Sequence, residues 1–409
     1  NLERVSGQLN DETLPIQDLY TTIGEVEALD THTLRVNLTE PDPLFLDNQA
    51  DLQFVPMEYT QENGFDALND NPVGTGPYEL ESWQRQDQMV MTARDDYFRG
   101  TAPIDTVEWQ PRPEAVSRLN GLTSGEGDLI KGVGAQSEPQ VTNASNAELK
   151  KVESARTAGL WLNMEQDVYD RDGSLFYDQP ELRKAVNYAI DTESIVENIL
   201  GGNGKTTQGW APSERYLGHN PDIEPYGHDP ERARELRDEA GFDEGDLSVT
   251  LLVPRERYPS GVAASEAIAT MLGDIGIDVE PNAIEFGQFA DQTQQQNIPG
   301  MMFAAWGNPT FNVLETYLSI VKSDALFSTL PANDQQDWVQ SVDETIETAA
   351  QTVNREELDS LLQEVEQMLH DNAAFVFMFQ YRDVYGVNTG LDWEPRSDEV
   401  MYMYNASTQ

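Results

Sequence analysis

The hydrophobic pattern of this chain changes near Pro180, and this change constrains the fold more than any other feature. Before it, short segments such as residues 31–38 alternate polar and apolar side chains, which is typical of strands with one covered face. After it, segments with apolar residues at helical spacing alternate with short apolar runs. Helices and strands in alternation are typical of a three-layer α/β fold. The sequence therefore predicts a β-rich first part followed by an α/β part.

The α/β part carries clear start and stop signals. Asp229 and Pro230 suit the N-cap and the first residue of a helix, and Gly241 is placed to end that helix. Asp191 is placed to cap another helix, which would reach Leu200. The other predicted elements are helices over residues 182–190, 263–272 and 355–370 and strands over residues 248–253, 277–280, 301–305 and 375–379.

The first part and the C-terminal tail carry weaker signals. The strand over residues 31–38 is expected to end at Pro41. The turn at residues 74–77 is expected to start a strand through Trp83, and another strand should follow at residues 89–92. The tail after residue 379 is long enough to return and pair with the first part.

Charge indicates where a protein like this works. The chain of 409 residues, long enough for two or three domains, carries 73 Asp and Glu against 25 Lys and Arg, a formal net charge of −48. At low salt such a surface repels itself, whereas at molar salt the Debye length falls to about 3 Å and screens the repulsion. We therefore expect a halophilic source. The same charge disfavours nucleic acid or an anionic membrane as a direct partner.

No catalytic or metal-binding motif stands out. The chain has no cysteine, which excludes disulfides, thiolate metal sites and cysteine catalysis. Residues 201–206 superficially match a phosphate-binding loop, but a predicted helix precedes them and Pro212 follows, so the structural context is wrong. His219 and His228, with the acids near them, could be drawn as a metal cluster, but a loop with scattered acids explains them better. We expect no metal, no cofactor and no catalytic residue.

The end of the predicted strand over residues 301–305 is the most informative place for a binding site. Trp306, Gly307 and Asn308 put an indole ring, a flexible residue and an amide at the C-terminal end of a strand, where ligands of α/β folds usually bind. A core tryptophan beside a tight turn explains the same residues equally well. On the residues alone, both interpretations stay open.

Three stretches in a fixed order resemble one protein family. Residues 73–80 have the sequence VGTGPYEL, residues 182–191 LRKAVNYAID and residues 229–242 DPERARELRDEAGF. Together they resemble the peptide/nickel class, family 5, of extracytoplasmic solute-binding proteins, the dipeptide and oligopeptide receptors that feed ABC importers. The resemblance runs from about residue 21 to the C-terminus, and together with the acidic composition it suggests a family member from a halophilic archaeon. Further matching segments are residues 29–34, 41–45, 125–129 and 276–279.

The resemblance implies a two-lobed periplasmic-binding-protein fold with a hinge. Residues 1–160 and 379–409 would form lobe I, residues 161–378 would form lobe II, and the hinge would lie near residues 160–163 and 379–381. Such a receptor has no catalytic group, closes around a peptide or other organic solute and delivers it to the permease of an ABC importer. We expect a monomer outside the cell, associated with its surface. The family has a further N-terminal segment, so lobe I is expected to be incomplete.

For the ligand site, the resemblance points to the segments after two strands. Arg255 or Arg257 would pair with an acidic end of the solute, as an arginine does in dipeptide receptors. Asn308 stands near the position where peptide-binding members carry an aspartate for the peptide's amino group, and an uncharged amide loses that charge-assisted bond. The other expected ligand contacts are Trp306, Trp161, Asn163 and Tyr381.

Two other functions are kept as alternatives. One is a secreted halophilic hydrolase, glycosidase-like, with two carboxylates at a cleft. An inward-facing pair of acids with one raised pKa would favour it, whereas a cleft lined by Trp, Tyr and Asn would favour the receptor. The other is a receptor of the same fold for nickel, haem or an oligosaccharide.

Overall fold

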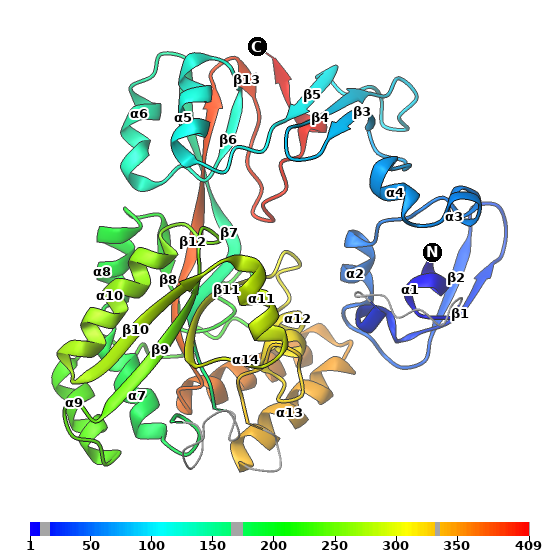
Figure 1. Cartoon of the computed structure of the whole chain (residues 1–409). Helices are drawn as coiled ribbons and strands as arrows, with labels where there is room; N and C mark the ends of the chain where they lie inside the picture. Colours follow the sequence, from blue (N-terminus) through cyan, green and yellow to red (C-terminus); the bar gives the residue numbers. More distant parts are fainter. Residues whose placement is uncertain (9–16, 165–174, 332–335, 409) are drawn as a thin grey trace.

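The computed structural model describes residues 1–8, 17–164, 175–331 and 336–408. Figure 1 shows two bodies joined by two long strands, with a smaller module of N-terminal residues beside them. We call the lower body lobe II, and the upper body together with the N-terminal module lobe I. Helices and strands alternate in lobe II, as the change of hydrophobic pattern near Pro180 predicts.

Lobe II is built on the main part of a 7-stranded sheet with the order β10-β9-β11-β7-β12-β6, in which β8 also pairs with β12. β9, β10 and β11 run parallel to one another, and β7 runs antiparallel to β11. β9 and β11 are largely buried, which explains why the sequence shows them as apolar runs. The bounds of these strands are Gly204–Thr206 (β8), Leu247–Pro254 (β9), Ile277–Ile284 (β10) and Gly300–Gly307 (β11).

Two strands pass through both lobes (Figure 1). They are β7 (Ala147–Leu162) and β12 (Phe375–Asn388), which pair antiparallel along their length, and the end of β12 also pairs with β6 (Leu129–Lys131) in lobe I. The register of this pair shifts twice, between Phe377 and Phe379 and between Gln380 and Arg382. Such irregularities bend a strand and increase its twist. The predicted strand over residues 375–379 is thus only the lobe II half of β12.

Helices pack around the lobe II sheet (Figure 1). The ends of α9 follow the sequence signals, because the side chain of Asp229 accepts a hydrogen bond from the N–H of Arg232 at 3.0 Å and Gly241 has a φ of +89°. The bounds are Pro180–Ala189 (α7), Pro230–Glu239 (α9), Gly261–Asp274 (α10), Phe286–Gln294 (α11), Val313–Thr316 (α12), Asp337–Ala350 (α13) and Arg355–Asp371 (α14).

The helix predicted after Asp191 is only partly regular. The cap forms as predicted, because Asp191 accepts from the N–H of Ser194 at 2.9 Å. However, the α-helical turn α8 (Thr192–Ser194) continues as a π-helical turn, η4 (Ile195–Ile199). The apolar spacing in the sequence does not distinguish these two kinds of turn over so few residues.

The upper body of lobe I holds an antiparallel sheet in the order β3-β4-β5. Strands β3 and β4 confirm the prediction for the segment after the turn at residues 74–77. The C-terminal tail also returns here, where β13 pairs with β14. The bounds are Tyr78–Gln84 (β3), Gln88–Ala93 (β4), Thr106–Trp109 (β5), Ala115–Ser124 (α5), Glu138–Thr142 (α6), Leu391–Asp392 (β13) and Ser407–Thr408 (β14).

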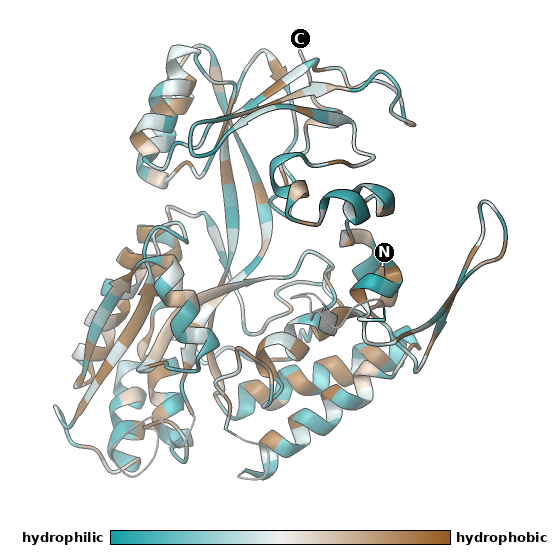
Figure 2. Cartoon of the chain, turned by 45° about the vertical axis from the view of Figure 1, so that its right-hand side comes forward, coloured by the Kyte–Doolittle hydropathy of each residue, from teal (hydrophilic) through white to brown (hydrophobic). Residues whose placement is uncertain are grey.

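The N-terminal module has a small core of its own, and its β1–β2 ribbon projects away from the rest of the molecule (Figure 2). The strand predicted over residues 31–38 is shorter than expected and less buried, with Leu34 54% exposed, because only its partner strand and this small core support it. The bounds are Leu2–Val5 (α1), Ile23–Ala28 (β1), Leu34–Leu38 (β2), Phe45–Asp51 (α2), Met57–Asn63 (α3) and Ala67–Asp70 (α4).

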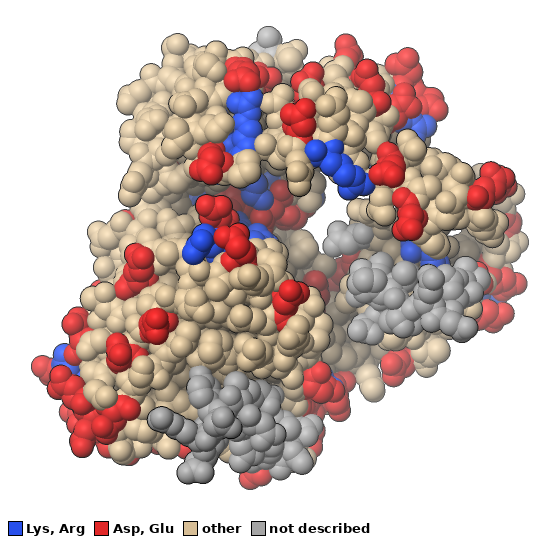
Figure 3. All heavy atoms as spheres, viewed as in Figure 1, with Lys and Arg blue, Asp and Glu red and all other residues tan. Residues whose placement is uncertain are grey.

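Acidic side chains are spread over much of the visible surface, and several Lys and Arg lie where the two lobes face each other (Figure 3). The largest hydrophobic core lies around the lobe II sheet and includes Trp161 and Phe375. Within the described ranges, none of the helices combines the length and the apolar character that a membrane crossing requires.

Candidate ligand site between the lobes

The C-terminal ends of the parallel strands β9, β10 and β11 meet at one edge of the lobe II sheet, where the paired strand β7 leads toward lobe I. Arg255 follows β9, and its backbone N–H donates to the carbonyl of Ile284 at the end of β10 at 2.7 Å. Its guanidinium donates to the carbonyl of Ala283 at 2.9 Å and lies 3.5 Å from the carboxylate of Glu285. The charge of Arg255 is therefore already compensated by a neighbour at this edge.

Arg257 lies at the same edge but has a different environment. Its guanidinium lies over the rings of Tyr258 and Phe286, at 5.3 Å from each centroid. The hydroxyl of Tyr258 donates to the carbonyl of Ala305 at 3.1 Å, which ties the segment after β9 to β11. Such cation–π contacts hold a guanidinium in place without neutralising it.

Trp306 is partly buried near the end of β11, with its ring 6.3 Å from that of Trp161 and 5.7 Å from that of Phe327. Trp161 is 2% exposed and packs edge-on against Trp210 and Phe375. Of the two tryptophans predicted to contact the ligand, Trp161 is thus a core residue, whereas Trp306 lies where the core meets the strand ends.

The two predicted amides are buried and support loops. Asn308, 2% exposed, donates to the carbonyl of Asn312 at 2.8 Å and to the hydroxyl of Thr316 at 3.0 Å, and so shapes the loop that follows β11. Asn163, 1% exposed, donates to the carbonyl of Ile298 at 2.7 Å. A buried amide with satisfied hydrogen bonds contributes to the rigidity of the loop that it holds.

Tyr381, the last of the predicted contacts, is 1% exposed. Its hydroxyl donates to the carbonyl of Pro259 at 3.3 Å, and its ring faces that of Tyr258 at 6.4 Å and the guanidinium of Arg156 at 5.2 Å. Burial raises the pKa of its hydroxyl far above the usual value, so the phenol stays neutral. Tyr381 therefore joins the segment after β9 to the crossing of the two long strands.

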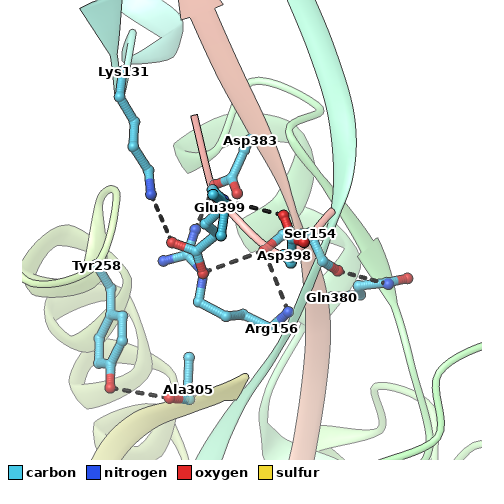
Figure 4. A network of polar contacts seen from close by, with 10 residues as sticks. Lys131, Ser154, Arg156, Tyr258, Ala305, Gln380, Asp383, Asp398 and Glu399 are labelled. Carbon is cyan, nitrogen blue, oxygen red and sulfur yellow. Dashed lines mark hydrogen bonds and ion pairs between the residues drawn. The ribbon is translucent and has the colours of Figure 1, made fainter. Parts of the chain in front are cut away.

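An ionic network that the sequence did not predict lies at this crossing (Figure 4). Arg156 of β7 pairs with Asp383 of β12, and its Nε lies 2.5 Å from the carboxylate of Glu399 in the C-terminal tail. The other oxygen of Glu399 lies 2.7 Å from Nζ of Lys131 on β6. The network joins strands and tail that are far apart in the sequence, so no local pattern could have found it.

A cleft of about 630 Å³ opens beside the crossing. Its lining includes Glu153 and Gln380 of the long strands, Lys205 of β8 and residues of the loop that follows β8. Glu366 of α14 also lines it, although this side chain is only 1% exposed, and it accepts from the N–H of Ala211 at 2.7 Å. Burial raises the pKa of Glu366 to about 8. Sequence reasoning could not have found Glu366, because one acid among 73 carries no signal.

The two histidines of the predicted loop do not come together at a metal site. Nδ1 of His219 lies 2.7 Å from the carbonyl of Ala211, whereas Nδ1 of His228 lies 3.5 Å from the carboxylate of Asp191. In the part of the chain that the structure describes, no group of three or more His, Cys, Asp or Glu residues is arranged to hold a metal ion.

Comparison with known proteins agrees with this architecture. Residues 3–326 match the family described as bacterial extracellular solute-binding proteins, family 5 Middle. The chain belongs to this family. Members of family 5 are extracytoplasmic binding proteins rather than enzymes. The resemblance that the sequence motifs indicate is therefore confirmed at the level of the family.

Individual family 5 proteins show the degree of similarity. Over 321 residues, the chain is 26% identical to the glutathione-binding protein GsiB of Shigella flexneri, an alignment that covers 76% of this chain and 59% of GsiB. The chain thus spans less than two thirds of the length of this curated relative.

Solved structures show the same fold. The periplasmic binding protein DppA from Helicobacter pylori, in complex with the peptide STSA, superposes with a TM-score of 0.81 and 22% identity over 96% of this chain and 75% of that chain. NikZ from Campylobacter jejuni, in complex with Ni(L-His), gives a TM-score of 0.81 and 21% identity over 96% of this chain and 80% of that chain. These similarities confirm the predicted α/β, two-lobed periplasmic-binding-protein fold.

Proposed function

We propose that this family 5 protein is a receptor that captures a peptide or another organic solute between its lobes and delivers it to an ABC importer. The observation that carries the proposal is the pair of strands β7 and β12, which joins two bodies with separate cores beside a cleft and the strand ends of lobe II. Lobes connected in this way can close around a solute, and binding energy then shifts an open/closed equilibrium. The relatives support the same role, because GsiB is named for glutathione binding, DppA was solved with a peptide and NikZ was solved with Ni(L-His).

The predicted site residues divide into two groups by their burial. Trp306 and Arg257 are at least partly exposed at the strand ends, and we expect them to contact the solute directly. Arg255 is also exposed there, but its guanidinium lies 3.5 Å from the carboxylate of Glu285, so we expect Arg257 to be the better partner for an acidic end of the solute. The other four have internal partners and low exposure, so we expect them to hold the walls of the site in place. They are Trp161, Asn163, Asn308 and Tyr381.

We propose that the hinge lies at the register shifts of the long strands. On β12 this region covers the predicted residues 379–381. On β7 the opposite residues are 153–158, which lie nearer to lobe I than the predicted residues 160–163. Leu160 and Trp161 pair with both β11 and β12, and ladders on both sides resist bending, whereas Glu153 lies beyond the end of the β11 ladder and pairs with β12 alone.

Binding without catalysis fits the cleft better than hydrolysis. Glu366 has the raised pKa that a general acid requires, and it lines the cleft. However, Glu366 is only 1% exposed, and its carboxylate accepts the N–H of Ala211, so it is engaged in holding the loop. We therefore assign no catalytic role to this protein.

The remaining expectations concern partners and surroundings. The partners would be the permease subunits of the importer, and the receptor would act as a monomer associated with the cell surface. The net charge of −48 supports a hypersaline environment, in which dissolved salt screens the acidic surface.

Isothermal titration calorimetry in molar KCl tests the proposal. Wild type and Trp306→Ala would be titrated with a panel of di- to pentapeptides, glutathione and oligosaccharides. We expect at least one solute class to bind wild type and to bind Trp306→Ala more weakly, by about tenfold for the loss of one stacking ring. Failure of every solute to bind wild type would contradict the receptor function, and unchanged affinity of the variant would remove Trp306 from the site.

A further inference from the structure

Arg215 lies on the rim between two concavities. It lines both the cleft of about 630 Å³ and a neighbouring one of about 470 Å³. Its guanidinium lies 3.6 Å from the centroid of the Phe311 ring, the distance of a stacked pair, and its Nη1 donates to the hydroxyl of Ser397 at 2.8 Å. Ser397 belongs to the C-terminal tail of lobe I, so Arg215 contacts both lobes.

The ring beneath Arg215 is held in a strained position. Phe311 has a φ of +57°, a conformation that residues other than glycine rarely adopt. Its carbonyl accepts the N–H of Leu217 at 2.8 Å, Leu217 in turn accepts the N–H of Val313 at 3.3 Å, and Tyr216 packs edge-on against the ring at 5.0 Å. Surrounding contacts of this kind keep a strained residue in place, and such residues cluster at functional sites. The fold thus fixes the Phe311 ring, and the ring fixes the guanidinium.

The charge of Arg215 is not compensated. Arg255 lies near Glu285, and Arg156 is paired with Asp383 and Glu399. Arg215 forms no ion pair with any carboxylate in the described ranges, although Asp and Glu outnumber Lys and Arg by 73 to 25 in this chain.

Lys205, which also lines this cleft, likewise has no ion pair among the described residues. The cleft also contains Glu153, but this carboxylate lies 3.9 Å from Arg382. Preorganised cations in a cleft, with free donors, are suited to bind an anionic group.

We propose that Arg215 is the anchor for a carboxylate of the solute in this cleft. The proposal rests on the receptor function above and names the chemical class of its solute. A guanidinium offers five N–H donors in a planar fork, and Ser397 uses one of them, so others remain for a carboxylate. Because Ser397 comes from lobe I, a solute held by Arg215 lies against both lobes, which ties recognition of the acid group to closure.

The test compares Arg215→Gln with Arg355→Gln. Both residues are exposed, neither has an ion pair within the described segments, and both substitutions change the net charge by the same amount, but Arg355 lines only the neighbouring concavity. Wild type and both variants would be titrated in molar KCl with glutathione, trialanine and trialanine amide, which lacks the C-terminal carboxylate. Melting curves would confirm that each variant is folded, and Arg215→Lys serves as a second variant that keeps the charge without the fork.

We expect glutathione or trialanine to bind wild type and Arg355→Gln equally and to bind Arg215→Gln about 10- to 100-fold more weakly, the effect of one hydrogen-bonded charge. Trialanine amide should bind wild type and Arg215→Gln with the same low affinity, and Arg215→Lys should lie between. The anchor is overturned if Arg215→Gln binds the acids like wild type, if the amide binds as tightly as the acid, or if none of the acid probes binds. The receptor function survives those results as long as some solute of the wider panel binds wild type.

Discussion

Arg156 and Asp383 form a buried ion pair between the neighbouring strands β7 and β12, with 5% of each side chain exposed. The pair lies where the two lobes meet, and Glu399 of the tail contacts the same guanidinium at 2.5 Å. Burial raises the pKa of Asp383 even though Arg156 opposes the shift. The strands that join the lobes are thus held together by an ionic network in which each charge needs its partner to stay buried.

Replacing Asp383 by Asn should destabilise the protein strongly, by about 3 kcal/mol, because it leaves the buried charge of Arg156 with only one acidic partner. Urea unfolding of wild type and variant at constant salt measures this. Asp70→Asn is the control, because Asp70 pairs with Arg85 at the surface, where 77% of its side chain is exposed, and should cause little measurable change. Equal effects of the two substitutions would contradict the assigned role.

Glu366 should make stability depend on pH. Its pKa is about 8 in the folded protein against an ordinary value of 4.5, so the folded state keeps a proton that the unfolded state releases in between. The contribution of Glu366 to the free energy of unfolding should therefore be fully present below about pH 4.5 and should be lost as the pH rises toward 8. Urea unfolding across this range should show a smaller decline for Glu366→Gln than for wild type. The same pH profile in both proteins would show that Glu366 does not cause it.

Gly209 should not tolerate a side chain. A Cβ at this position would lie 2.4 Å from one carboxylate oxygen of Glu366 and 2.9 Å from the other. Gly209→Ala should therefore cost about 1–3 kcal/mol of stability, the usual effect of overpacking. Gly74→Ala is a matched control, since a Cβ there meets nothing within 4 Å. Thermal or urea unfolding of both variants checks the prediction, which a stable Gly209→Ala protein would contradict.

Salt should stabilise the protein. With a net charge of −48, the acidic surface repels itself most in dilute buffer. We expect the unfolding temperature to rise steadily as KCl is increased from millimolar to molar concentrations, and to rise far less in glycerol of equal osmolality. A melting temperature that does not change with KCl would remove the support for a halophilic source.

Sequence patterns predicted lobe II well, because its elements obey local rules. The cap at Asp229 and the buried strand β11 each follow from a few neighbouring residues. Membership of family 5 could also be predicted from the sequence, because the family's motifs are short and occur in a fixed order. The lower half of β12 was found for the same reason, since it is a continuous apolar run.

The ionic network and the burial of the site residues were not predictable. Lys131, Arg156 and Glu399 meet only because the tail returns across the long strands, a contact that spans 268 residues between Lys131 and Glu399. The upper half of β12 was missed because it mixes polar and apolar residues, and the strand with which it pairs is more than 200 residues away in the sequence. Whether a residue such as Asn308 faces solvent or the protein interior depends on the geometry of its loop. In this structure its amide is buried and donates a hydrogen bond within its own loop.

The strands β7 and β12 couple the unfolding of the two lobes. Each strand is continuous through both bodies, so an excised lobe II would begin and end in the middle of a strand and would expose unpaired ladder groups. Unfolding of the sheet in either lobe would therefore remove strand pairing that also supports the other lobe. We therefore expect heat to melt both lobes together in one cooperative calorimetric transition, in which the β7–β12 ribbon carries the cooperativity from one core to the next.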